Sequence, residues 1–282
     1  MSGGPWSFAG ATPLDAELAL ALRAAARGAE LAREGAGGAL RAERKSLGDY
    51  VTEVDRRIDA AIAAILAHTD LRIVSEELHP LDPGEPLPDD CWIVDPLDGS
   101  NAYIVGARRE LVSCMLALRL GGETELAVLH FPFSDEVVFA GRGHGAYRGA
   151  ERLRVDPRIE LADSWIALNH YGDLQLETDR FAALARALRG PRGAMLVTVD
   201  PPGSGLALSM LGAGNRLGAV LHDNNPRRRK QEIWDVIPPR LVLEEAGAVF
   251  LDGGGRRYRP ESCELVLAAR SRRLAETILA LA

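Results

Sequence analysis

Cysteine is scarce in this sequence, and no long apolar run occurs in it. The three cysteines, Cys91, Cys114 and Cys263, are scattered through apolar stretches and form no C-x-x-C pair. We therefore expect buried, reduced thiols of the kind found in cytosolic proteins. No stretch approaches the roughly 20 apolar residues that span a bilayer, and the N-terminus has no basic segment followed by an apolar core. These absences predict a cytoplasmic protein that has no signal peptide and no membrane partner.

An excess of positive charge is also absent. The 282 residues include 33 Lys and Arg against 40 Asp and Glu, a formal net charge of −7. This balance argues against a general binder of nucleic-acid polymers, and the lack of a basic stripe with interleaved aromatics argues against a metal-dependent nuclease. An anionic small substrate is still compatible, because bound cations can invert the local charge. The length allows one large domain or two ordinary ones.

The apolar pattern changes along the chain. Helical periodicity predicts helices at 14–34 and 53–68, with a strand at 71–74 between the second helix and a Pro- and Asp-rich loop. Apolar segments separated by turns predict an antiparallel sheet over 112–155, in which G-R-G-H-G at 141–145 is a hairpin turn rather than a nucleotide loop. From 164 onward, strands and helices alternate in the sequence. The expected strands are 164–169, 194–199, 217–221, 248–251 and 264–268, and the expected helices are 178–188, 204–211, 238–246 and 271–281.

This organisation predicts a mixed α+β and α/β fold, arranged as a layered αβαβα sandwich. We expect residues 1–156 to form an N-terminal α+β domain, with an antiparallel sheet, two helices and the metal-binding residues. Residues 157–282 should form a C-terminal α/β domain that completes the active site, with the boundary near Asp156-Pro157.

The central stretch is CWIVDPLDGSN, residues 91–101. Its apolar run at 92–94 predicts a buried strand, which Pro96 is expected to end because proline has no N–H to donate to a ladder. Asp95 and Asp98 follow the run and cannot both be buried without a partner. A magnesium ion fits, since Asp95, Asp98 and the carbonyl of Leu97 are hard oxygen ligands.

The residues after Asp98 add a second feature. Gly99, Ser100 and Asn101 offer successive backbone N–H groups at the start of a predicted helix, where phosphate is well held. Metal ligands beside a phosphate cradle predict phosphoryl chemistry.

Other acidic residues have ordinary explanations when taken singly. Asp55 lies in the first turn of a predicted helix and would complement its dipole. Glu76-Glu77 follows a strand and would usually be surface. Asp235 precedes the predicted helix 238–246 and would be a good N-cap, with prolines in the first turn.

Taken in order, these motifs are more specific. D-Y-V-T with Asp55 behind it, Glu76-Glu77 after a strand, D-P-L-D-G-S, and Trp234-Asp235 before a helix ending in E-E-A-G resemble the inositol monophosphatase family. This family belongs to the magnesium-dependent, lithium-sensitive phosphatases. The resemblance runs from about residue 45 to residue 247.

The resemblance implies a ligand set for two or three Mg²⁺ ions, with the site between the two halves of the chain. Glu76, Asp95 and the Leu97 carbonyl would hold the first ion. Asp95, Asp98 and Asp235 would hold the second, and a weaker third ion would lie near Glu76.

The resemblance also implies roles in the reaction. Glu76 and Ser100, with Asp55 and Thr52 behind them, would orient the attacking water, and Glu77 and Lys45 would support the ligands. The implied substrate contacts are Leu97, Asp98, Gly99, Ser100, Asn101, Gly203, Ser204, Gly205, Arg228 and Asp235. Glycines at 203–205 could equally serve only a tight strand-to-helix turn.

We therefore expect a phosphoric monoester hydrolase acting on a small phosphorylated polyol, with inositol monophosphate as the leading substrate. Arg228 stands where the family places a glutamate that holds ring hydroxyls, and a guanidinium favours anions. This favours the alternative of a sugar bisphosphate, such as fructose 1,6-bisphosphate, or a 3′(2′),5′-bisphosphate nucleotide, unless the basic run is only a solvated loop. A catalytically idle relative that binds metal or phosphate is a further alternative. A homodimer and lithium sensitivity are implied by the resemblance alone.

Overall fold

The computed structural model describes residues 6–37, 41–46, 49–82, 84–106, 109–169, 179–191, 193–200, 217–223, 233–259 and 265–281. The chain divides into two compact units. Unit 1 contains the described residues up to 153 together with Trp234–Glu245, and unit 2 contains those of 154–200, 217–233 and 246–281. Asp235 therefore belongs to the same unit as the acidic residues of the N-terminal half. The division into domains at 1–156 and 157–282 stays a prediction.

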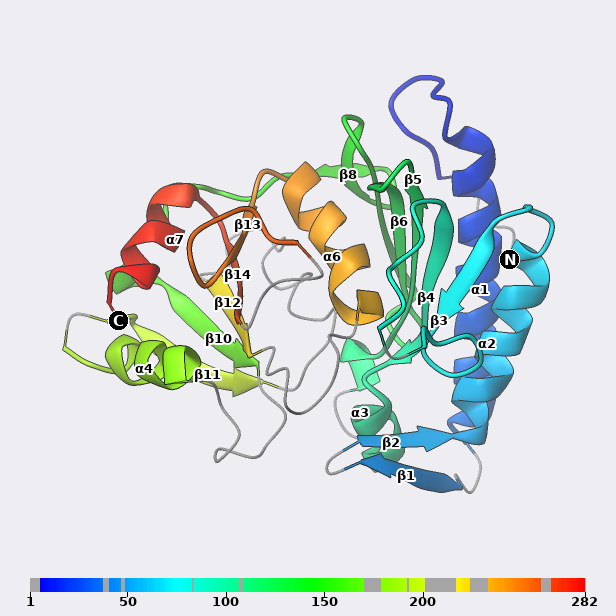
Figure 1. The fold of residues 1–282 in the computed structure, drawn as a ribbon, viewed down its shortest axis with the longest axis horizontal. Helices are drawn as coiled ribbons and strands as arrows, with labels where there is room; N and C mark the ends of the chain where they lie inside the picture. Colours follow the sequence, from blue (N-terminus) through cyan, green and yellow to red (C-terminus); the bar gives the residue numbers. More distant parts are fainter. Residues whose placement is uncertain are drawn as a thin grey trace. The chain divides into compact units, whose positions relative to one another are not determined.

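Unit 1 is built on a seven-stranded sheet with the order β3-β4-β5-β6-β7-β8-β9 (Figure 1). Its strands are β3 (Arg72–Ser75), β4 (Cys91–Asp98), β5 (Ser113–Leu120), β6 (Glu123–Phe131), β7 (Glu136–Gly141), β8 (Gly145–Arg148) and β9 (Glu151–Leu153). β3 and β4 are parallel, whereas every later pair of neighbours is antiparallel. The antiparallel sheet predicted over 112–155 is confirmed, and so is the hairpin turn at 141–145.

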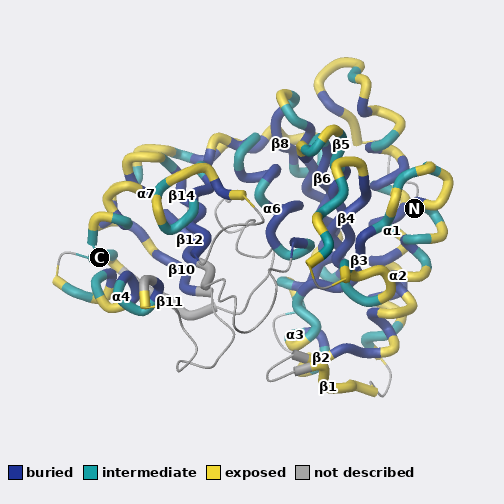
Figure 2. The backbone as a smooth tube through the Cα atoms, viewed as in Figure 1, coloured by how far each residue is buried: buried dark blue, intermediate teal, exposed yellow. Residues whose placement is uncertain are grey.

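Two helices cover one face of this sheet, α1 (Asp15–Gly35) and α2 (Glu53–Leu66). Their apolar stripes pack on the strands in one core cluster, in which Leu18, Ile62 and Trp92 are at most 2% exposed. Figure 2 shows the same helices buried toward the sheet and exposed on the opposite side. The structure confirms both predicted helices. Each has an apolar stripe at helical spacing, and the sheet supplies the surface that buries it.

A glycine allows the close approach of α1. A Cβ added at Gly28 would lie 2.9 Å from Cys114 Sγ on β5 and 3.1 Å from Ile58 Cγ2 on α2. Real Cβ atoms almost never come so close to a neighbour, so the side chain here must be a hydrogen. This close approach sets the spacing of α1 against α2 and the sheet.

The structure contains a hairpin that the sequence analysis missed. β1 (Ala42–Ser46) pairs with β2 (Asp49–Thr52) in an antiparallel ladder. Its first strand, AERKS, is short and largely charged, so it lacks the alternation of apolar and polar residues that identifies a strand. The hairpin delivers Lys45 and leads directly into α2 at Thr52.

Pro96 does not end its strand, so that part of the prediction is wrong. β4 continues to Asp98, and its pairing with β5 shifts between Asp95↔Met115 and Asp98↔Ser113. Three steps on β4 therefore match two steps on β5, which is a bulge of one residue. A proline is tolerated at a bulge because the ladder there requires no N–H from it.

Helix α6 (Ile233–Glu245) begins earlier than predicted. The prediction placed Asp235 ahead of a helix at 238–246, but Asp235 lies in the first turn of α6, and the Pro238-Pro239 pair lies inside the helix. Asp235 is therefore not an N-cap. The sequence predicts the prolines in a first turn, where they cost least, whereas in α6 they follow that turn. α6 lies on the opposite face of the seven-stranded sheet from α1 and α2 (Figure 1).

The last residue of α6 ties this helix to the sheet. Glu245 accepts hydrogen bonds from the backbone N–H of Gly143, at 2.8 Å, and of Gly145, also at 2.8 Å. Gly143 lies in the turn between β7 and β8, and Gly145 is the first residue of β8; their φ angles are +75° and +89°. Such backbone conformations favour glycine and turn successive N–H groups toward one anion. The glycine-rich turn thus binds a carboxylate of the protein itself.

Unit 2 has a mixed five-stranded sheet with the order β11-β10-β12-β14-β13. Its strands are β10 (Trp165–Asn169), β11 (Leu196–Asp200), β12 (Leu217–Asp223), β13 (Val249–Asp252) and β14 (Leu265–Ala269), and its helices are α4 (Asp179–Leu188) and α7 (Arg272–Leu279). β11, β10 and β12 are parallel, and β14 is antiparallel to both β12 and β13. The helix predicted at 204–211 lies outside the described residues.

The predicted fold class is confirmed, because each unit combines a mixed sheet with helices packed on it. None of the helices in the described ranges is both long and apolar enough to cross a membrane.

We expect Glu245→Ala to lower the free energy of unfolding by about 1.5–3 kcal/mol, since it removes a charged acceptor from two backbone donors. Urea unfolding of purified protein measures this change. Glu151→Ala, at an exposed position on β9, is the matched control and should change stability by less than about 0.5 kcal/mol. Equal effects of the two substitutions would contradict the anchoring role of Glu245.

Candidate metal centre

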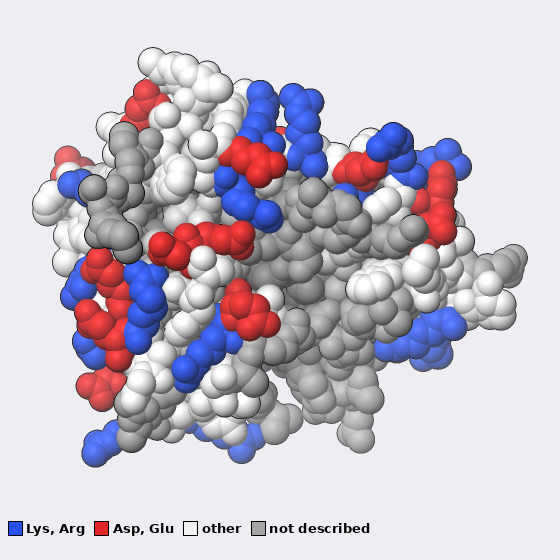
Figure 3. Space-filling view, turned by 180° about the vertical axis from the view of Figure 1, so that it is seen from behind, with Lys and Arg blue, Asp and Glu red and all other residues white. Residues whose placement is uncertain are grey.

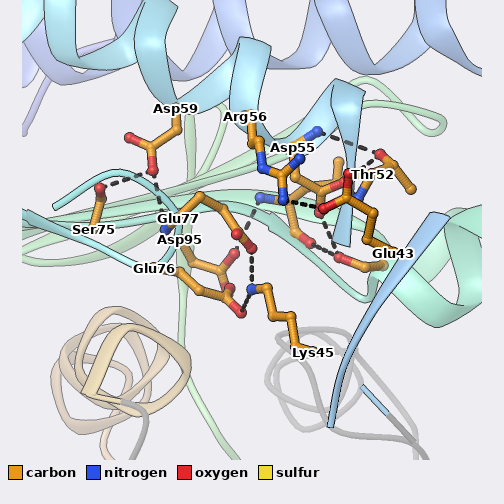
Figure 4. A network of polar contacts seen from close by, with 12 residues as sticks. Glu43, Lys45, Thr52, Asp55, Arg56, Asp59, Ser75, Glu76, Glu77 and Asp95 are labelled. Carbon is orange, nitrogen blue, oxygen red and sulfur yellow. Dashed lines mark hydrogen bonds and ion pairs between the residues drawn. The ribbon is translucent and has the colours of Figure 1, made fainter. Parts of the chain in front are cut away.

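Acidic residues from three separate segments converge in unit 1. Glu76 follows β3, Asp95 lies on β4 and Asp235 lies in the first turn of α6, and one carboxylate oxygen of each lies within 4.8 Å of the other two. Figure 4 shows Glu76 and Asp95 pointing toward the same region. The prediction that acidic residues distant in sequence meet at one place therefore holds for these three residues.

The bulge in β4 explains why Asp95 and Asp98 are both directed toward this place. Residues three positions apart in a regular strand point to opposite faces. The bulge adds one residue, so Asp95 and Asp98 pair with Met115 and Ser113, which share a face of β5. Cys114 and the next alternate residues of β5 pack against the α1 and α2 side. Both aspartates therefore project toward the α6 side, where Asp235 lies.

Asp95 is the most enclosed of the three ligand candidates, with 1% of its surface exposed. Its Oδ1 accepts a hydrogen bond from the Leu97 N–H at 3.1 Å, while its buried Oδ2 has no hydrogen-bond partner among the described residues. Burial, followed by the charges of Glu76 and Asp98, raises the pKa of Asp95 well above its ordinary value. A buried carboxylate oxygen that lacks a donor is a fit for a cation.

Glu76 is subject to the same repulsion. Burial and the negative charge of Asp235 raise its pKa to about 8, and the ammonium of Lys45 acts against this shift. One lysine thus offsets only part of the negative charge. The donor set consists of oxygens, without imidazole or thiolate, and such a set suits Mg²⁺ or Ca²⁺ rather than a softer metal.

Lys45 reaches this cluster from the β1–β2 hairpin. Its Nζ lies 2.9 Å from Glu76 Oε1 and also contacts Glu77 Oε1 (Figure 4). Burial lowers the pKa of Lys45, but the charges and hydrogen bonds of the two glutamates outweigh burial and raise it overall. The Lys45 ammonium is therefore bound at the edge of the cluster. The Glu77 side chain points toward this ammonium rather than toward solvent.

Two further predicted ligands are engaged within the protein. Asp98 is 6% exposed, and its Oδ2 lies 3.4 Å from Ser113 Oγ. The carbonyl oxygen of Leu97 lies 2.9 Å from Ser100 Oγ. Neither contact uses all the lone pairs of these oxygens. Metal binding by Asp98 and by the Leu97 carbonyl stays a prediction.

Thr52, Asp55 and Ser100 form a hydrogen-bonded chain beside the cluster. The hydroxyl of Thr52 contacts Asp55 Oδ2, and Ser100 Oγ lies 2.7 Å from Asp55 Oδ1. Thr52 and Asp55 also form a capping box at the start of α2. Burial raises the pKa of Asp55, and the hydrogen bonds from Ser100 and Thr52 act against this rise. The helix-terminal interpretation of Asp55 is confirmed, and its role in the reaction stays a prediction.

The predicted phosphate cradle is only partly described. Gly99 has φ of +85°, which only glycine adopts readily, and it immediately precedes the short helix α3 (Ser100–Val105), where Asn101 is exposed. The predicted substrate contacts at Gly203, Ser204, Gly205 and Arg228 lie outside the described residues.

Asp59 is a residue near the cluster that the sequence analysis did not single out. It lies one helical turn after Asp55, is 0% exposed, and accepts hydrogen bonds from the segment that carries Glu76. The available signal was its spacing of four from Asp55, which places the two aspartates on one face of a helix.

Similarity to known proteins covers nearly the whole chain. The inositol monophosphatase family matches residues 14–282. The Nus factor SuhB of Haemophilus influenzae is 32% identical over 244 residues, which cover 85% of each chain. The inositol-1-monophosphatase of Mesorhizobium japonicum is 29% identical over 226 residues, 76% of this chain and 77% of its own. A solved IMPase/NADP phosphatase, complexed with NADP and Ca²⁺, superposes with a TM-score of 0.75 at 19% identity and covers 96% and 97% of the two chains.

We expect Mg²⁺ to raise the melting temperature of the wild-type protein by more than that of Asp235→Asn, which lacks one of the three converging carboxylates. An ion present at a hundredfold its Kd would stabilise the folded state by about 2.7 kcal/mol. Differential scanning fluorimetry over a Mg²⁺ titration measures the shift. Asp70→Asn, at an exposed position after α2, is the control and should respond like wild type. Equal shifts in all three proteins would place the ion elsewhere.

Proposed function

The chain belongs to the inositol monophosphatase family, and we propose on this basis that it is a Mg²⁺-dependent phosphomonoesterase acting on a small phosphorylated polyol. Inositol monophosphate is the leading substrate. The observation that carries the proposal is the convergence of Glu76, Asp95 and Asp235 within 4.8 Å, next to the hydrogen-bonded chain from Thr52 to Ser100.

The residues proposed to hold Mg²⁺ are Glu76, Asp95, Asp98, Asp235 and the carbonyl of Leu97, for two or three ions. The buried, unpartnered Oδ2 of Asp95 supports this assignment, because a cation would supply the missing counter-charge. When bound, two such ions lower the pKa of a water molecule and stabilise the leaving oxygen of the phosphate ester.

Asp55 determines what the Ser100 hydroxyl can do. Ser100 has one proton to donate, and both the Asp55 carboxylate at 2.7 Å and the Leu97 carbonyl at 2.9 Å can only accept it. The shorter contact to the charged acceptor favours donation to Asp55 Oδ1. The lone pairs of Ser100 Oγ can then accept a hydrogen bond from a water molecule. Thr52 holds the other oxygen of Asp55. We therefore assign Ser100 and Glu76 to orienting the attacking water, with Asp55 and Thr52 behind them.

The remaining residues are assigned to supporting and substrate contacts. Lys45, which binds both Glu76 and Glu77, would hold these two carboxylates in place. The proposed contacts to the substrate are Leu97, Asp98, Gly99, Ser100, Asn101, Gly203, Ser204, Gly205, Arg228 and Asp235.

A second candidate is a phosphatase for bisphosphorylated sugars or nucleotides. Arg228 would favour a second anionic group, and the IMPase/NADP phosphatase of similar fold was solved with a dinucleotide bound. On the face shown in Figure 3, acidic and basic side chains of the described residues are interspersed, without a continuous basic stripe. This supports a small substrate over a nucleic-acid polymer.

A catalytically idle binding protein is the competing class, since several relatives are named Nus factors. Phosphate release separates the two classes. A cytoplasmic location, a homodimer and inhibition by lithium stay predictions.

We expect Mg²⁺-dependent phosphate release from a panel of inositol phosphates, sugar bisphosphates and nucleotide bisphosphates, highest for inositol monophosphate. Asp98→Asn and Asp235→Asn should each reduce kcat by at least about 100-fold, because each removes a proposed ligand charge. Colorimetric phosphate assays with and without Mg²⁺ measure this, and Asp70→Asn is again the control. Near wild-type turnover in both variants would contradict the assignment of Asp98 and Asp235 as metal ligands.

Ser100→Ala should lower kcat by about 100-fold or more, the usual contribution of a group that handles a proton in the reaction. Ser100→Thr keeps the hydroxyl and should retain most of the activity. Steady-state kinetics at saturating Mg²⁺ compare the two variants. Equal losses in Ala and Thr variants would argue for a packing role instead.

A further inference from the structure

Asp59 lies on α2 with its side chain directed at the turn after β3 (Figure 4). Its Oδ2 accepts three hydrogen bonds, from Ser75 Oγ at 2.8 Å, from the Leu78 N–H at 3.0 Å and from the Glu77 N–H at 3.2 Å. All three donors belong to one short segment, residues 75–78. The carboxylate thus lies at the centre of this turn.

Backbone hydrogen bonds also stabilise this turn. The Ser75 N–H donates to the His79 carbonyl at 3.1 Å, and the Glu76 N–H donates to the Val94 carbonyl on β4 at 3.3 Å. The hydroxyl of Ser75 also accepts from the His79 N–H at 3.1 Å. Ser75 is 0% exposed, so its hydroxyl depends on Asp59 and His79 for its partners.

The shape of this turn decides where Glu76 and Glu77 point. Consecutive side chains of an extended strand point to opposite faces. Here both glutamates reach the same ammonium, that of Lys45, and Glu76 also approaches Asp95 and Asp235. The strand ends at Ser75, and the turn that follows directs both carboxylates to one place.

Apolar packing does not explain an aspartate here. A fully buried carboxylate loses its hydration, which is costly unless specific donors compensate for it. The donors that compensate belong to the turn and all bind Oδ2, whereas the buried Oδ1 has no hydrogen-bond partner among the described residues. These bonds fix the backbone of the turn rather than the core of α2.

We propose that Asp59 is a positioning residue of the metal centre, whose carboxylate holds residues 75–78 in the turn that directs Glu76 toward Asp95 and Asp235. This inference rests on the proposed function, because it presumes that Glu76 is a metal ligand. In this role Asp59 is not itself a metal ligand. It acts through the backbone of the segment that carries Glu76.

The test compares Asp59→Asn with Ile62→Ala. Asparagine keeps the shape of the side chain but loses its charge, so the turn should loosen while the protein stays folded. Ile62 is equally buried on the same helix, in the apolar core, so its truncation reproduces a purely structural loss. Isothermal titration calorimetry with Mg²⁺ on each folded variant gives a readout separate from activity.

We expect Asp59→Asn to weaken Mg²⁺ binding about 10- to 100-fold, the range usual for groups that orient metal ligands, and to raise the Mg²⁺ concentration for half-maximal phosphate release in parallel. Ile62→Ala should lower the midpoint of urea unfolding without changing Mg²⁺ affinity. Ser75→Ala should act like a weaker Asp59→Asn, and the double variant should be no worse than Asp59→Asn alone, since both residues act through one turn.

Unchanged Mg²⁺ affinity in folded Asp59→Asn, or equal losses in Asp59→Asn and Ile62→Ala, would overturn the positioning role while leaving the proposed function intact. Wild-type protein that neither binds Mg²⁺ nor releases phosphate would overturn the proposed function, and this inference with it. The wild-type titration therefore tells the two failures apart.

Discussion

Mutual repulsion between carboxylates removed from water is the constraint on which the arrangement of unit 1 depends. Glu76, Asp95 and Asp235 approach within 4.8 Å, and burial raises the pKa of Glu76 and of Asp95. These carboxylates repel one another, so other parts of the structure must keep them close together. The seven-stranded sheet carries Asp95, while the turn after β3 and helix α6 bring the other two side chains to it. The apolar packing of α1 and α2 on this sheet supplies stability that offsets the repulsion.

The supports of the cluster are themselves mostly charged groups bound to backbone donors. Glu245 fixes the far end of α6 through the turn at Gly143 and Gly145, and Asp59 is bound by the turn that carries Glu76. Lys45 is a cation that binds the cluster directly. Each support originates on a different element, so the site is determined by the packing of the whole unit rather than by one local motif.

The sequence predicted most elements correctly where an apolar stripe repeats, as in α1 and α2, because burial of such a stripe has one structural solution. Predictions from local residue preferences failed where contacts with other parts of the fold determined the backbone. Pro96 lies within β4 because a bulge removes the need for its N–H, and Pro238 lies inside α6. The β1 strand was missed because its residues are largely charged. The convergence of Asp235 with Asp95 came from family resemblance, since no spacing rule joins residues so far apart. Asp59 was missed because two of its three partners are backbone N–H groups, which leave no trace in the sequence.

The bulge in β4 has a consequence for how this segment can vary among homologous proteins. Asp95 and Asp98 share a side of the sheet only because the strand carries one residue more than its neighbour between them. Residue types within D-P-L-D could change without altering that count, but a one-residue insertion or deletion would turn one aspartate to the helix-covered core. Gaps in alignments should therefore be rarer across these four positions than substitutions, and the length of this segment is as much a part of the site as its carboxylates.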